Sequence, residues 1–184
     1  MRKAAWRLLQ SAAAALFWRG GWGAAAAGPP ATADLVQHLS CETCRMGMWV
    51  ANHQAGDVGH DADRVADMVE NLCSPRRWEG QWVTMVDVVD AFNVAGEPGL
   101  TLQRKMEEGE CRRECELVRR ACSAMKKGRD EALSQALQDK MPLEGLKEVF
   151  CNRHCSKLRP LDLTSWGDEA FAPRKPGGRV ESEL

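Results

Sequence analysis

Eight cysteines constrain the fold of this 184-residue chain more than any other feature of its sequence. Cys41 and Cys44 form a close pair at the start of the set, and Cys151 and Cys155 form another at its end. Residues three or four apart share one face of a helix, so each pair can present two sulfurs to a facing helix. Two such pairs would make parallel crossbridges, and a third bridge could join the helices between them. The pattern predicts a disulfide framework, which is typical of an oxidising compartment. The remaining cysteines are Cys73, Cys111, Cys115 and Cys122.

The first 33 residues differ in composition from the rest of the chain. They contain basic residues and a run of alanines but no Asp or Glu, and an apolar stretch from Leu8 to Trp18 precedes small residues at 24–28. Residues 1–33 are therefore predicted to be a signal or targeting peptide rather than part of the fold. The cysteines favour a secretory signal, and an organellar transit peptide is the alternative. No apolar run reaches the roughly 20 residues of a membrane-spanning helix, so no transmembrane segment is predicted.

Without this segment the chain is acidic. Four of the 25 Lys and Arg residues lie in the first 33 positions, whereas all 26 Asp and Glu residues follow them, which leaves a net charge of −5 (21 minus 26). This charge argues against a general nucleic-acid binder, so no nucleic-acid partner is expected.

Helical periodicity predicts a mainly α fold. Residues 35–54 form the first predicted helix, and Asp61 is the predicted N-cap of a second helix that ends at residues 74–75, Ser-Pro. The residue composition differs in the insert at 78–105, whose segment Trp82–Leu102 is rich in β-branched residues around a Gly- and Pro-containing turn. This composition predicts a β-hairpin.

The helical pattern returns from about Glu107. One face of this predicted helix carries three sulfurs, because its apolar positions include Cys111, Cys115 and Cys122. Gly128 is its predicted C-terminal residue, and two more helices are expected, at 129–140 and from Pro142 onward. Residues 159–184 are rich in Pro, Gly and charge, and a flexible C-terminal tail is expected there.

These features resemble the saposin-like superfamily, whose six-cysteine framework fastens a closed leaf of helices. Within it, the chain is most similar to the canopy-type (MIR-interacting saposin-like) proteins, and to their plant and algal branch. Three features carry the resemblance: Cys41-Glu-Thr-Cys44, the strand-rich insert Trp82–Leu102, and Gly109-Glu-Cys-Arg-Arg-Glu-Cys115. The resemblance covers residues 34–158, which it identifies as a saposin B-like, canopy-type domain.

The resemblance also implies a disulfide pairing. It pairs Cys41 with Cys155, Cys44 with Cys151, and Cys73 with Cys122. Cys111 and Cys115 are additional to this framework, and they form either a fourth bond or a reactive dithiol. Zinc held by the two terminal pairs, near His154, is the alternative to crossbridges. It would leave Cys73 and Cys122 without a role, so neither metal nor cofactor is predicted.

Canopy-type proteins reside in the endoplasmic reticulum lumen, and several assist the folding of membrane receptors. The resemblance therefore implies a lumenal co-chaperone or adaptor for secretory or membrane clients, acting alone or with a lumenal chaperone. A lipid-binding or lipid-transfer saposin is the alternative, and a dithiol oxidoreductase using Cys111 and Cys115 is a weaker one. The sequence contains no nucleophile elbow or phosphate loop, and no enzymatic activity is expected.

Two further groups of residues bear on this function. Trp78 and Trp82 either pack the hairpin or form a partner-binding surface. The terminus Glu181-Ser-Glu-Leu184 resembles a lumenal retrieval signal but has Glu181 where Lys or His is usual and Ser182 where Asp is usual. Its residues are Glu181, Ser182, Glu183 and Leu184. Secretion, or import into an organelle, is the alternative to retention in the lumen.

Overall fold

The computed structural model describes residues 32–92, 98–156, 163 and 166–175. Its fold is mainly α with one small antiparallel hairpin, consistent with the saposin-like arrangement expected from the sequence. In chain order the elements are α1 (Thr32–Asp57), α2 (Ala62–Asn71), the 3₁₀ helix η1 (Trp78–Met85), β1 (Val86–Phe92), β2 (Pro98–Arg104), α3 (Arg113–Lys126), α4 (Asp130–Gln138) and α5 (Leu143–Cys155). The first helix begins at Thr32, inside the segment 1–33 expected to be removed, and the rest of that segment lies outside the described residues.

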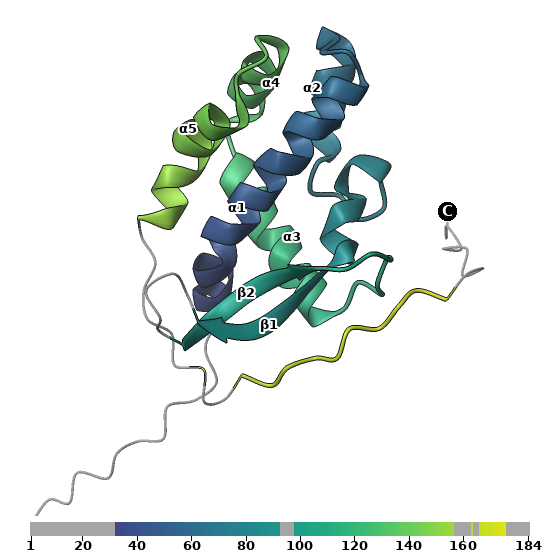
Figure 1. Ribbon diagram of the computed structural model, residues 1–184, viewed down its shortest axis with the longest axis vertical. Coiled ribbons are helices and arrows are strands. Elements are labelled where there is room, and N and C mark those ends of the chain that lie inside the picture. Colours follow the sequence, from purple (N-terminus) through teal and green to yellow (C-terminus); the bar gives the residue numbers. More distant parts are fainter. Residues whose placement is uncertain (1–31, 93–97, 157–162, 164–165, 176–184) are drawn as a thin grey trace, which may run out of the picture.

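Helix α1 is the centre of the helical part. It packs against α3 and α5, while α2 packs against α4, and the hairpin crosses one end of the helices (Figure 1). The interior between the helices is filled by large side chains that are less than 2% exposed; they include Leu39, Met48, Val65, Met68, Leu72, Val118, Leu133 and Leu146. Burying one such side chain contributes about 1.5–3 kcal/mol, so these contacts hold the helices together.

The predicted helix ends are confirmed at two positions. The Asp61 side chain accepts a hydrogen bond from the Arg64 backbone N–H at 3.0 Å and thereby caps α2. Gly128 follows the end of α3 with a φ of 70°, a conformation that glycine adopts without steric cost.

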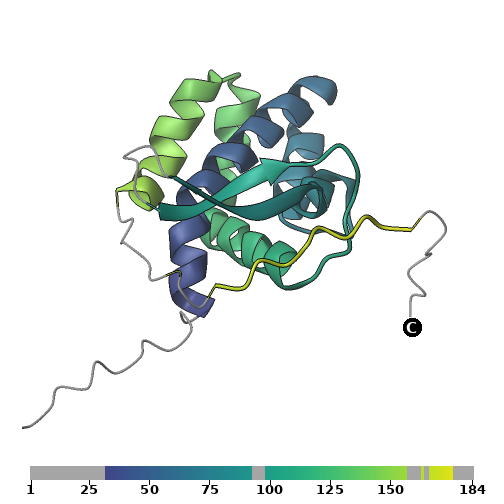
Figure 2. The same cartoon turned by 60° about the horizontal axis from the view of Figure 1, so that its bottom comes forward.

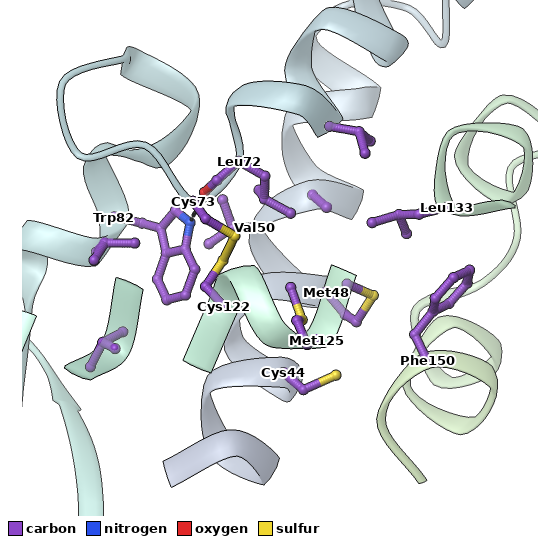
Figure 3. Close-up of a cluster of buried hydrophobic side chains, with 14 of the residues drawn as sticks. Cys44, Met48, Val50, Leu72, Cys73, Trp82, Cys122, Met125, Leu133 and Phe150 are labelled. Carbon is purple, nitrogen blue, oxygen red and sulfur yellow. Dashed lines mark hydrogen bonds between the residues drawn. A yellow bond between two sulfur atoms is a disulfide. The ribbon is translucent and has the colours of Figure 1, made fainter. Parts of the chain in front are cut away.

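The hairpin begins later than the sequence predicted. Its strands pair from Val86 with Arg104 to Phe92 with Pro98, whereas Trp82 belongs to η1. The reason is tertiary: Trp82 is only 8% exposed, and its indole N–H donates to the Leu72 carbonyl at 2.8 Å (Figure 3). The indole therefore anchors the insert to the end of α2, and the chain turns before it extends.

Helix α3 also begins later than predicted. It starts at Arg113, so Cys111 precedes it and only Cys115 and Cys122 lie on the helix. The prediction of three sulfurs on one helical face is wrong. The segment before the helix is held extended, because the Gly109 backbone N–H donates to the Thr84 carbonyl at 2.7 Å.

The tail prediction needs a correction as well. Residues 166–175 lie extended across the hairpin end of the molecule, near the start of α3 (Figures 1 and 2). Backbone hydrogen bonds and two aromatic side chains hold this segment, which we call the strap. Because the tail is rich in Pro, Gly and charged residues, its sequence predicted flexibility and not these contacts with the rest of the fold.

Candidate functional site: the disulfide framework and the strap site

Four disulfides fasten the chain. Two of them, Cys41–Cys155 and Cys44–Cys151, join α1 to α5, and a third joins Cys73, just after α2, to Cys122 of α3. These are the three pairs that the resemblance implies. The fourth bond is Cys111–Cys115, with a Cα–Cα distance of 5.0 Å. All eight cysteines are bonded, so the sulfurs that the zinc alternative requires are occupied.

The fourth disulfide closes a short ring at the start of α3. Cys111 is exposed, whereas Cys115 is buried in the first turn of the helix. Of the two expected forms, the structure contains the bond and not the free dithiol. The ring includes Glu114, whose side chain is the centre of the site described next.

Glu114 connects α3 to the hairpin and to the strap. Its Oε2 accepts the backbone N–H of Val88 at 3.1 Å, and its Oε1 accepts the backbone N–H of Glu169 at 2.9 Å. Burial raises the pKa of this carboxyl above its ordinary value, an effect that the two hydrogen bonds oppose and that the negative charges of Asp87 and Asp168 reinforce. Glu114 stands in the element Gly109–Cys115 that carries the family resemblance, but no role for its side chain was predicted from the sequence.

The strap runs antiparallel to residues 108–110. The Glu110 backbone N–H donates to the Ala172 carbonyl at 2.8 Å, and the Arg174 backbone N–H donates to the Glu108 carbonyl at 2.7 Å. Gly109 and Pro173 form the bridge between them. The strap is thus held as an added strand would be held at the edge of a sheet.

Side chains hold the strap as well, and one of these contacts is the ion pair between Arg174 and Glu108 at 2.9 Å. The ring of Phe171 lies directly on Gly109, where a Cβ atom would come within 2.7 Å of it, and the Lys105 ammonium is 5.5 Å from the ring centroid. The Arg113 guanidinium stacks 4.5 Å from the ring centroid of Trp166. We call the surface formed by Lys105, residues 108–110, Arg113 and Glu114 the strap site. The aromatic residues of the tail were the sequence signal that could have predicted it.

The two tryptophans expected to contact partners lie in different environments. Trp82 is buried against Leu72 and Cys73, so its assignment to a partner-binding surface is corrected (Figure 3). Trp78 is 55% exposed at the start of η1, where Arg76 and Arg77 are also exposed. A second exposed aromatic, Trp49 of α1, is covered by the Arg104 guanidinium at 4.7 Å.

The retrieval signal predicted at Glu181–Leu184 lies outside the described residues. Within the described part of the chain, no helix combines the length and the apolar character needed to cross a membrane.

No protein-family model, curated protein or solved structure matches this chain. The class of the protein is given by its fold alone. The fold is mainly α, is fastened by disulfides and is consistent with the saposin-like type.

Proposed function

We propose that the protein is a canopy-type co-chaperone or adaptor of the endoplasmic reticulum lumen, which binds partly folded secretory or membrane proteins. One observation supports binding at the outer surface: Trp78 is 55% exposed while the interior between the helices is filled. Trp and Arg are the residues that most often dominate protein–protein binding energy, and Trp78 follows two exposed arginines.

The filled interior weighs against the lipid alternative. A lipid chain between the helices would have to displace side chains such as Leu39, Met48 and Val65, which are less than 2% exposed. Exposing each of them costs about 1.5–3 kcal/mol. The disulfides between α1 and α5 and between Cys73 and α3 would resist the same opening.

A pull-down from an endoplasmic reticulum lysate tests the proposal. We expect Trp78→Ala to lower recovery of newly synthesised client chains. Val149→Ala is the matched control, since Val149 is 53% exposed on α5. Lipid that co-purifies, or vesicle binding with no client recovered, would move the protein to the lipid-transfer class.

Localisation is tested separately. A tag inserted between Ser156 and Leu163 keeps both ends of the chain native. We expect the fusion in the endoplasmic reticulum, and we expect secretion after removal of Glu181–Leu184. Fluorescence in a mitochondrion or plastid would refute the proposed compartment.

Exposure of Cys111 favours one weaker candidate, thiol–disulfide exchange. A client thiolate would attack Sγ of Cys111, forming a mixed disulfide, and Cys115 would leave as a thiolate in the first turn of α3, where the helix N-terminus stabilises negative charge. Titration with glutathione and mass spectrometry tests this step. Glutathione on Cys111 before any framework bond opens would support it, and simultaneous opening of all four bonds would exclude it.

A further inference from the structure

We propose that the strap site is a binding site for an extended client segment, and that the strap is its built-in competitor. This inference rests on the proposed function, because it names the surface through which a client polypeptide would be held. The preferred segment carries an aromatic residue between small residues, as in Ala170-Phe-Ala172 of the strap.

The main chain supplies the first part of the recognition. Three backbone groups of the strap bind the Glu114 carboxylate or the backbone of residues 108–110: the N–H of Glu169, the carbonyl of Ala172 and the N–H of Arg174. Every non-proline residue carries the same groups, so another extended polypeptide can make the same three bonds.

Side chains supply the selectivity. Gly109 lacks a Cβ and thereby lets the Phe171 ring lie against the backbone, while the Lys105 ammonium faces the same ring at 5.5 Å. The Arg113 guanidinium stacks on a second aromatic ring, that of Trp166, and also donates a hydrogen bond to the Gly167 carbonyl. Two cations beside these ring positions favour aromatic residues in the bound segment.

The strap fits this site imperfectly, which makes it replaceable. Within the described residues, Trp166 Nε1 and Glu169 Oε2 are buried without a hydrogen-bond partner. A buried polar atom that lacks a partner costs about 1–3 kcal/mol. A client segment with apolar or shorter groups at these two positions would avoid that cost.

Attachment to the chain offsets the imperfect fit. The strap follows Ser156 after a short connection, and a tethered segment competes at an effective concentration on the order of millimolar. A free peptide that makes the same contacts therefore binds the intact protein weakly. Weakening the strap within the full-length chain should raise the affinity for such a peptide.

The probe is a fluorescent synthetic peptide with the sequence of residues 166–175, measured by fluorescence anisotropy. We expect Phe171→Ala in the full-length chain to tighten peptide binding by at least about tenfold over the unaltered protein. Lys175→Ala is the matched control, because it changes an exposed strap residue outside these contacts, and it should leave binding unchanged. A peptide with Ala in place of the phenylalanine should lose the binding.

A second variant tests whether the peptide binds at the strap site. Gly109→Ala, added to Phe171→Ala, puts a Cβ where the peptide's phenylalanine would lie and should abolish binding. Circular dichroism and the disulfide map check that the double variant is folded; if it is not, Lys105→Ala is used in its place and should weaken binding. Equal peptide affinity for the unaltered protein and Phe171→Ala, or binding unaffected by every strap-site change, would overturn the inference.

The client pull-down separates this inference from the proposed function. If Trp78→Ala reduces client recovery while Phe171→Ala leaves it unchanged, the proposed function stands and the strap site is not the client site. If the peptide binds as expected but no client is recovered, the strap site stands and the co-chaperone role fails.

Discussion

The two disulfides between α1 and α5 should contribute to stability in a strongly non-additive way. Cys41–Cys155 and Cys44–Cys151 are nested, and they close segments with sequence separations of 114 and 107 residues. When either bond is present, the other closes only the remainder, which is seven residues (114 minus 107). The chain-entropy model therefore assigns very different values to the first and the second bond.

The magnitudes follow from the loop lengths. Cys73–Cys122 already closes 49 residues inside the long loop, so 65 residues remain (114 minus 49). Closing this remainder contributes about 4.3 kcal/mol, and closing the additional seven-residue loop contributes about 2.4 kcal/mol. Replacing one pair of cysteines by alanine should cost about 2.4 kcal/mol, and replacing both pairs should cost about 7 kcal/mol. The Cys44–Cys151 replacement should cost somewhat more than the other, because Cys44 and Cys151 are at most 1% exposed and their removal leaves a cavity.

Guanidinium unfolding without reductant, followed by circular dichroism, measures these differences. A peptide map of each variant must first show that the other disulfides are intact. The reasoning is refuted if each single replacement costs about 4 kcal/mol or more, or if the double replacement costs no more than the two single replacements together.

Three further predictions concern single residues and urea unfolding. Trp82→Phe removes the donor to the Leu72 carbonyl and should cost about 1–3 kcal/mol; an unchanged midpoint would contradict the anchoring role of the indole. Gly80→Ala brings a Cβ against the Ser74 backbone and should cost about 1–3 kcal/mol, whereas equal stability would mean that this turn shifts freely. The raised pKa of Glu114 means that its contribution to stability is fully present below pH 4.5 and is lost as the pH rises through the raised value; Glu114→Gln should remove that loss, and an unchanged pH profile would contradict it.

The features predicted well from the sequence depend on local geometry or on a strong covalent pattern. Asp61 caps α2 through its own side chain, and Gly128 ends α3 by its own backbone freedom, so neither needs information from distant residues. The three framework disulfides follow from cysteine order once the helices are placed and the family resemblance supplies the pairing.

The features that were missed depend on contacts between distant segments. Trp82 lies among β-branched residues that favour a strand, but its hydrogen bond to Leu72 holds it in η1. The periodicity around Cys111 suggests a helix, but pairing of residues 108–110 with Thr84 and the strap keeps that segment extended. Glu114 is one acid among several in sequence, and only the fold places it between two backbone N–H groups.

The position of the strap site relative to the disulfides favours ligand exchange at the surface over opening of the helices. Displacing the strap breaks the three hydrogen bonds of its backbone to Glu114 and residues 108–110, each with a net value of about 0.5–1.5 kcal/mol. It also breaks the Arg113 bond to the Gly167 carbonyl and the exposed Arg174–Glu108 ion pair. An incoming segment can form the same backbone bonds. Opening the interior would instead expose side chains such as Leu39 and Met48 at about 1.5–3 kcal/mol each. It would also work against the disulfides that join α1 to α5 and Cys73, just after α2, to α3. Under the proposed function, a client segment would therefore exchange with the strap while the helical core stays closed, and the peptide and pull-down experiments are designed to detect this exchange.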